Sequence, residues 1–233
     1  MDIQILELIT GAEQASGLVV VIDVFRAFST ACYLFAAGTE KIIAVGDVEV
    51  AYELQQKNPS YILVGEREGR ILPGFDFGNS PSRIKDIDFT GKTVVLTTSA
   101  GTQGIIKASN AEEIITASFV NSGAVVKYIT EVAPEKLSLV AMGIGGQKSA
   151  PEDVFCAQYI KNSLQGQKQT PPFSEIISRL KQSSGQRFFD ENLDWSPEKD
   201  FQLCLVRDKF DFVLQASPVD YNQEMAFLKK QEV

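Results

Sequence analysis

The sequence predicts an α/β protein with three layers, α/β/α, built on a mostly parallel sheet that is mixed in places. Two observations favour this class. Short apolar runs of strand length alternate with segments of helical length, which is the pattern of βαβ units. Residues 18–22 are apolar throughout, as expected for a parallel strand buried on both faces. With 233 residues, we expect one unit, residues 1–233, within which two similar lobes, about 1–90 and 91–233, enclose the site.

The elements follow from apolar runs and from helix breakers. Gly38 and the pair Asn58-Pro59 each end a helix, and Pro151 begins one. The expected strands are residues 2–9, 18–22, 41–45, 61–65, 93–98, 113–117 and 137–142. The expected helices are residues 29–35, 47–57, 103–109, 151–164, 174–182 and a tail helix from about 218. The units that start at residues 18 and 93 share one order of elements, which indicates an internal duplication.

The region after residue 164 differs from the rest. Residues 165–172 form a polar, proline-bearing linker, and an irregular stretch around Trp195 precedes an apolar run at 203–206. We expect few chemical groups here and interpret the region as a cover for a sheet face or as an interface.

Composition excludes several classes of function. The formal net charge of −8, without a basic run, argues against nucleic-acid binding. The absence of histidine excludes serine–histidine and cysteine–histidine catalysis and most zinc hydrolase sites. The three widely spaced cysteines argue against a disulfide framework. Without a signal segment or a membrane-length apolar run, we expect a cytoplasmic protein that makes no membrane contact.

The central stretch of the chain is residues 18–30. The buried strand ends at Asp23, and Arg26 follows in a short loop ahead of a helix that begins near Ser29. The carboxyl end of a parallel strand, next to a helix N-terminus, is where α/β proteins place ligand chemistry. We therefore predict catalytic roles for Asp23 and Arg26. The alternative is that Asp23 only caps the turn and that Arg26 pairs with it.

A second informative stretch is residues 65–84. Glu66 follows a strand, as Asp23 does, and is our third predicted catalytic residue. The glycines and prolines exclude regular structure, yet the apolar side chains require burial, so an ordered loop is expected. It offers oxygen and arginine contacts for a substrate, namely Arg70, Asp76, Asn79 and Ser80. The alternative is a loop whose Asp and Asn side chains cap turns.

Three further segments carry polar groups at helix starts. The loop at 97–102 suits an anion, with Thr97, Thr98, Gly101 and Thr102 as predicted substrate contacts. Asn121 begins a helix, and Glu152 and Asp153 lie in the first turn of another. Capping explains each of these segments as well as ligand binding does.

Three phosphate-handling classes can be excluded by their motifs. A cysteine phosphatase needs an arginine at fixed spacing after its cysteine, and none follows Cys32, Cys156 or Cys204 at that spacing. A haloacid-dehalogenase-type enzyme needs a second Asp where this chain has Phe25 after Asp23. A phosphate-binding GxxxxGK[ST] loop is absent.

With these stretches identified, the chain resembles the 2-phosphosulfolactate phosphatase family. The resemblance rests on ordered motifs over most of residues 1–165: VVIDVFRAFST (20–30), GEREG…GFDFGNSP (65–81), TTSAGT (97–102), SFVNS (118–122) and the SAPED helix with Cys156. One departure is Ala100, where family members often carry Asn, so this loop offers hydroxyls without a side-chain amide.

The resemblance implies a Mg²⁺-dependent phosphatase that converts 2-phosphosulfolactate to sulfolactate and phosphate, a step of coenzyme M biosynthesis in methanogens. It also implies a homodimer. A highly anionic substrate can share a site with several carboxylates only if a hard cation bridges them. Our hypothesis is that Asp23, Glu66 and Asp153 hold Mg²⁺, while Arg26 and the threonine loop bind phosphate or sulfonate. The nucleophile is either water or a carboxylate. The alternatives are a phosphatase of another small carboxylated phosphomonoester and a non-catalytic binder of small anions.

Overall fold

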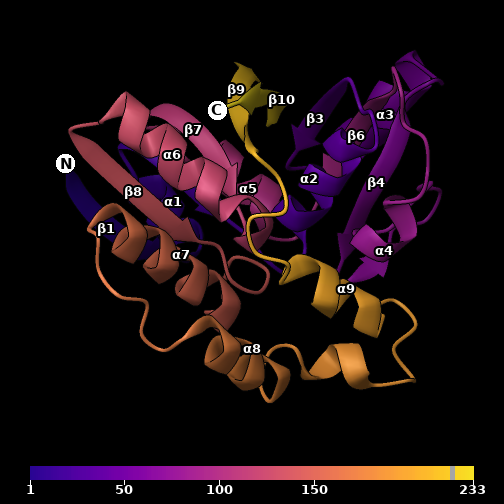
Figure 1. Ribbon diagram of the computed structural model, residues 1–233. Helices are drawn as coiled ribbons and strands as arrows, with labels where there is room; N and C mark the ends of the chain where they lie inside the picture. Colours follow the sequence, from indigo (N-terminus) through magenta and orange to yellow (C-terminus); the bar gives the residue numbers. More distant parts are fainter. Residues whose placement is uncertain (221–223) are drawn as a thin grey trace.

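The computed structural model describes residues 1–220 and 224–233, and it confirms the predicted three-layer α/β/α fold with a mostly parallel sheet (Figure 1). Within those residues, ten strands form one sheet in the order β1-β8-β2-β7-β9-β10-β3-β6-β4-β5. No helix among them is long and apolar enough to cross a membrane.

The first group of strands is parallel and has the central run of the sequence at its middle. It comprises β1 (Asp2–Glu7), β8 (Lys136–Ala141), β2 (Gly17–Ile22) and β7 (Ala111–Ala117). All six residues of β2 are buried. Val19 and Val21 belong to the core on one face, and Val20 and Ile22 to the core on the other, which explains the unbroken apolar run.

The second group is also parallel, apart from its edge. It comprises β3 (Lys41–Val45), β6 (Thr93–Thr97), β4 (Ile62–Arg67) and the short antiparallel β5 (Arg70–Ile71). An antiparallel hairpin, β9 (Phe212–Asp220) and β10 (Met225–Glu232), lies between the two groups and pairs with β7 and β3 (Figure 1). The expected lobe boundary near residue 90 falls between β6 and its two partner strands, β3 and β4.

Helices cover both faces of the sheet. The inner layer, α1 (Leu8–Gln14), α2 (Ala27–Ala36) and α5 (Gly101–Lys107), shares one core with strands of both groups. The outer face of the first group carries α6 (Ser122–Val132), α7 (Pro151–Leu164) and α8 (Phe173–Lys181), and that of the second carries α3 (Val48–Lys57). Short helices complete the fold: α4 (Pro81–Ile84), α9 (Glu198–Cys204), η1 (Phe119–Asn121) and η2 (Gln186–Phe189).

The predicted tail helix is wrong. Residues through Asp220 belong to β9, and Met225–Glu232 form β10, while residues 221–223 lie outside the described part. The segment from Met225 contains Met, Ala, Leu and Lys, which favour helix locally. Pairing with β3 and β9 overrides this preference, because the hairpin joins the two groups of strands.

One smaller expectation needs correction, and one apolar run without a predicted element is now placed. The first strand ends at Glu7, and residues 8–9 begin α1, which the sequence did not predict. The apolar run at 203–206 is the end of α9 and the turn after it.

Candidate active site

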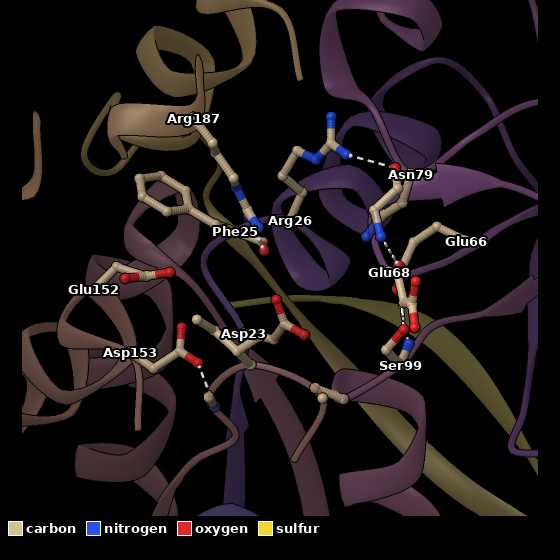
Figure 2. A pocket seen from close by; sticks show the side chains of 15 residues that line it. Asp23, Phe25, Arg26, Glu66, Glu68, Asn79, Ser99, Glu152, Asp153 and Arg187 are labelled. Atoms are coloured by element: carbon tan, nitrogen blue, oxygen red, sulfur yellow. Dashed lines mark hydrogen bonds between the residues drawn. The ribbon is translucent and has the colours of Figure 1, made fainter. Parts of the chain in front are cut away.

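The carboxyl ends of strands from both groups surround one cavity of about 310 Å³ (Figure 2). It is bordered by Asp23 after β2, Glu66 near the end of β4, Ser99 after β6 and Gly143 after β8. We call it the acidic cavity, because five carboxylates and two arginines line it: Asp23, Glu66, Glu68, Glu152 and Asp153 with Arg26 and Arg187.

Asp23 lies at the inner end of this cavity and is 6 % exposed. Its Oδ1 accepts a hydrogen bond of 3.0 Å from the Ala27 backbone N–H, so it does cap the turn into α2. Its Oδ2 faces Gly101, where an added Cβ would come within 2.9 Å of this oxygen. Burial, together with the charges of Glu66 and Glu152, raises the pKa of Asp23 to about 7.

Asp153 and Glu152 enter from the first turn of α7. Asp153 accepts backbone N–H groups on both oxygens, from Val24 at 2.8 Å and from Gly143 at 2.8 Å, and so ties two strand-end loops together. Glu152 accepts a hydrogen bond from the Ser184 hydroxyl. Burial raises the pKa of Asp153 well above its usual value, with the Asp23 charge as the next cause, and burial raises the pKa of Glu152 as well.

Glu66 faces Asp23 across the cavity (Figure 2). Its Oε1 accepts the Ser99 backbone N–H at 2.7 Å, and its Oε2 accepts the Gly69 N–H at 2.7 Å and the Ser99 hydroxyl at 3.2 Å. Glu66 therefore fixes the loop after β6 against the turn after β4, besides presenting a carboxylate to the cavity.

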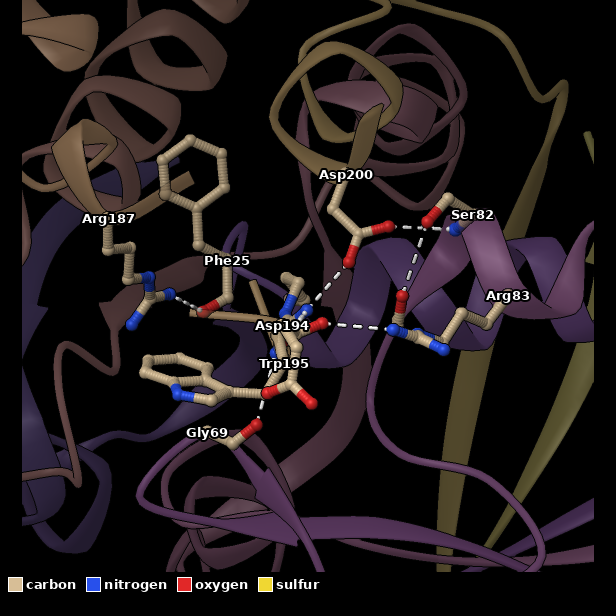
Figure 3. Close-up of polar contacts among 10 residues, drawn as sticks. Phe25, Gly69, Ser82, Arg83, Arg187, Asp194, Trp195 and Asp200 are labelled. Carbon is tan, nitrogen blue, oxygen red and sulfur yellow. Dashed lines mark hydrogen bonds and ion pairs between the residues drawn. The ribbon is translucent and has the colours of Figure 1, made fainter. Parts of the chain in front are cut away.

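Arg26 pairs with Asp200, not with Asp23. Its Nη1 lies 2.6 Å from the Asp200 carboxylate, and the two side chains are 3 % and 0 % exposed. The same nitrogen donates to the Trp195 carbonyl at 2.8 Å, and Nη2 donates to the Gly69 carbonyl at 3.4 Å (Figure 3). The alternative of an Asp23–Arg26 pair is therefore wrong.

Arg187, on η2, is a cavity residue that the sequence interpretation missed. It is half-buried, donates from Nη2 to the Phe25 carbonyl at 3.1 Å, and has a buried Nε without a partner. Among the residues described, no carboxylate forms an ion pair with it. Burial lowers the pKa of Arg187, as does the charge of Arg26. The expectation of few chemical groups after residue 164 is therefore wrong. The sequence around Arg187 contains no recognisable motif, and its only distinctive feature is the pair of Phe residues that follows.

The threonines predicted to contact the substrate form hydrogen bonds within the protein instead. Thr98 and Thr102 bond each other: the Thr102 N–H donates to Thr98 Oγ1 at 3.1 Å, and the Thr98 N–H donates to Thr102 Oγ1 at 3.0 Å. Thr97 accepts from Arg67 at 3.0 Å. Of this loop, Ser99 and Ala100 line the cavity.

The other predicted contacts divide between two places. Asn121 caps η1 by accepting the Ser118 N–H at 3.0 Å. Asp76 accepts the Leu63 N–H at 2.8 Å and so holds its loop against β4. Neither residue lines the acidic cavity. Asn79 lines the acidic cavity, whereas Arg70 and Ser80 line a neighbouring one.

The acidic cavity suits a hard cation by its donor set. Asp23 and Asp153 are both buried, and the charge of Asp23 raises the pKa of Asp153. Asp23 Oδ2 accepts no hydrogen bond from the residues described. In that same part of the chain, no three His, Cys, Asp or Glu side chains form a ready metal cluster. Mg²⁺ needs only one or two protein carboxylates, because water and substrate phosphate complete its shell. The residues present therefore fit this ion.

The acidic cavity lies at the carboxyl ends of parallel strands, where α/β enzymes place their ligand sites. The profile of the family described as 2-phosphosulpholactate phosphatase matches residues 3–218. A relative from Bacillus subtilis (strain 168) is 30 % identical over 197 residues, 84 % of this chain and 85 % of the relative. One from Carboxydothermus hydrogenoformans is 38 % identical over 211 residues, 84 % of each chain. Both are named "Probable 2-phosphosulfolactate phosphatase". The chain belongs to this family of phosphoric monoester hydrolases.

Proposed function

We propose that the protein is a Mg²⁺-dependent phosphatase that hydrolyses 2-phosphosulfolactate to sulfolactate and phosphate. The family membership supports the reaction, and the names of the relatives support the substrate. The observation that carries the metal requirement is the acidic cavity itself. Its five carboxylates outnumber its two arginines, and this excess negative charge opposes the binding of a phosphomonoester dianion unless a cation accompanies it.

In this proposal, Asp23 and Asp153 hold the ion, and Glu66 presents a further carboxylate from the opposite wall. When bound, Mg²⁺ supplies neutralisation of the charge on the phosphoryl oxygens. The loops that carry these acids are fixed by the hydrogen bonds from Val24 and Gly143, so the ligands are positioned before substrate arrives.

Arg187 and Arg26 have different roles in the same proposal. Asp200 and two backbone carbonyls hold the Arg26 guanidinium in one position, so its role is to line the cavity without moving. Arg187 has an unpartnered Nε and one protein acceptor, so its remaining N–H groups can donate to phosphate. Phe25, packed edge-on against Phe188 at a ring separation of 5.0 Å, gives this part of the cavity an apolar side that limits water.

The first test is phosphate release from a panel of small phosphomonoesters, with Mg²⁺ and with EDTA. We expect turnover of 2-phosphosulfolactate that EDTA abolishes and that added Mg²⁺ restores. Equal turnover with and without the chelator would contradict the metal requirement. Turnover only of another carboxylated phosphate would retain the mechanism and reject the substrate, and no turnover by folded protein would favour the anion-binding alternative.

Arg187→Gln tests the assignment of the phosphate-binding arginine. We expect kcat/KM to fall by about 10²–10³-fold, the scale of losing one preorganised donor to transition-state charge. Because Arg187 makes one hydrogen bond to the protein through its guanidinium, thermal unfolding should change little. The matched control is Arg179→Gln on α8, whose exposed side chain pairs with Glu175. An Arg187 variant with the activity of that control would refute the assignment.

The homodimer stays a prediction of the family resemblance. Sedimentation equilibrium of the purified chain measures it directly.

A further inference from the structure

A second cavity, of about 370 Å³, adjoins the acidic cavity and shares Arg26, Gly69 and Asn79 with it. Its charge has the opposite sign. Three arginines, Arg26, Arg70 and Arg83, line it against a single carboxylate, Asp194. We call it the basic cavity. A molecule that occupied both cavities would have one end beside the carboxylates of the acidic cavity and the other beside the arginines of the basic cavity.

The floor of the basic cavity is made of buried polar groups. Arg26 is 3 %, Asn79 4 % and Ser80 3 % exposed, so these groups are held by the fold and are not mobile surface side chains. The Asn79 Oδ1 is buried and has no hydrogen-bond partner among the described residues. The amide lies at the junction of the two cavities, and either of its ends can face a bound molecule by rotation about the last side-chain bond. An unpartnered buried amide costs free energy unless a ligand satisfies it.

The outer wall comes from the C-terminal region. Arg83 donates to the Asp194 carbonyl at 2.9 Å, and Trp195 packs on Gly69 so closely that an added Cβ would lie 2.2 Å from the ring (Figure 3). Glycine at position 69 is thus needed for the Trp195 wall, as well as for its positive φ of 82°. Asp194 also lines the basic cavity. Its backbone carbonyl accepts the hydrogen bond from Arg83 and so orients the Arg83 guanidinium.

We propose that the basic cavity binds the non-reacting anionic end of the substrate, a sulfonate, while the phosphate occupies the acidic cavity. This inference rests on the proposed function. Arginine guanidinium groups donate paired, charge-assisted hydrogen bonds to oxyanions. The three arginines stand against Asp194 and the Asp200 that pairs with Arg26, so one positive charge is left to balance a monoanionic ligand end. In this proposal, a small ester with phosphate and sulfonate on adjacent carbons places one group in each cavity, on either side of the shared residues Arg26, Gly69 and Asn79. The basic cavity then sets specificity, and the acidic cavity performs the reaction.

The test compares two substrates that differ in the sulfonate: 2-phosphosulfolactate and 2-phospholactate. The measured quantity is the ratio of their kcat/KM values in the wild type, in Arg70→Gln, in Arg83→Gln and in the double variant. Each single variant loses one charge-assisted hydrogen bond to the sulfonate, so we expect the ratio to fall roughly tenfold in each single variant and further in the double variant. Arg179→Gln should keep the wild-type ratio. An unchanged ratio in the double variant would overturn the proposal.

A binding measurement separates this inference from the proposed function. If the wild type hydrolyses neither ester, the proposed function fails. Calorimetric titration with sulfolactate then tests the basic cavity by itself. Sulfolactate affinity that is at least tenfold weaker in the double variant than in the wild type supports the subsite, and equal affinity, or no binding by either, refutes it.

Discussion

Asp23→Asn is expected to lower phosphate release on the order of 10³-fold while raising the thermal stability of the metal-free protein. Asn keeps the Oδ1 that accepts the Ala27 N–H, so the turn into α2 is preserved. It removes a negative charge from a buried cluster in which Glu66 and Glu152 raise the pKa of Asp23. The stability gain should be on the order of 1 kcal/mol, or roughly 2–4 °C in Tm for a chain of this size.

The stability difference between the Asn variant and the wild type should depend on pH. Burial raises the pKa of Asp23 to about 7, so the folded protein holds a proton that the unfolded chain, with the usual value of 3.8, releases earlier. Between about pH 4 and pH 7 the folded state therefore binds more protons, and stability falls as pH rises. The Asn variant lacks this group, so its advantage in EDTA should be small at pH 4 and largest above pH 7.

The measurement is urea unfolding at several pH values in EDTA, beside phosphate release with Mg²⁺. Asp86→Asn, an exposed acid that pairs with Lys85, is the matched control and should change neither quantity appreciably. An Asp23 variant that is less stable than the wild type would contradict the charge-repulsion argument, and one that retains full turnover would remove Asp23 from the active site.

Residues at strand ends were predictable, because the carboxyl ends of parallel strands share an edge of the sheet. Asp23 and Glu66 lie at the ends of two strands far apart in sequence, and both line the acidic cavity. Short polar side chains next to helix starts were not predictable in the same way. Thr98 and Asn121 can cap or bind a ligand at the same positions, and the structure uses both as hydrogen-bond partners of their own loops.

The C-terminal contribution could not be predicted, for a physical reason. Arg187, Trp195 and Asp200 lie in irregular segments or short helices, where no periodicity indicates which way a side chain points. Their roles come from contacts more than a hundred residues away along the chain, such as the Arg26–Asp200 pair. The same limit applies to the hairpin of β9 and β10, whose place in the sheet depends on both strand groups.

The buried ion pair of Arg26 and Asp200 gives the second large expected effect. Arg26→Gln and Asp200→Asn should each destabilise the fold by about 3–5 kcal/mol, because each leaves the other side chain charged, buried and without its partner. The double variant should lose less than the sum of the two, since it contains no isolated charge. Asp200 also accepts the Ser82 N–H at 2.8 Å, and Asn can keep that hydrogen bond.

Urea unfolding of the four proteins forms a double-mutant cycle, with Arg179→Gln and its exposed partner Glu175→Gln as a matched cycle of small effects. Additive losses in the Arg26–Asp200 cycle would show that the two residues do not depend on each other. A strong coupling has a functional consequence. Arg26 borders both the acidic and the basic cavity, and it is held there by Asp200 from α9 and by the carbonyl of Trp195. The C-terminal region, which carries few of the family motifs, then fixes the arginine on which both cavities depend, so its loss would impair phosphate release and sulfonate recognition together.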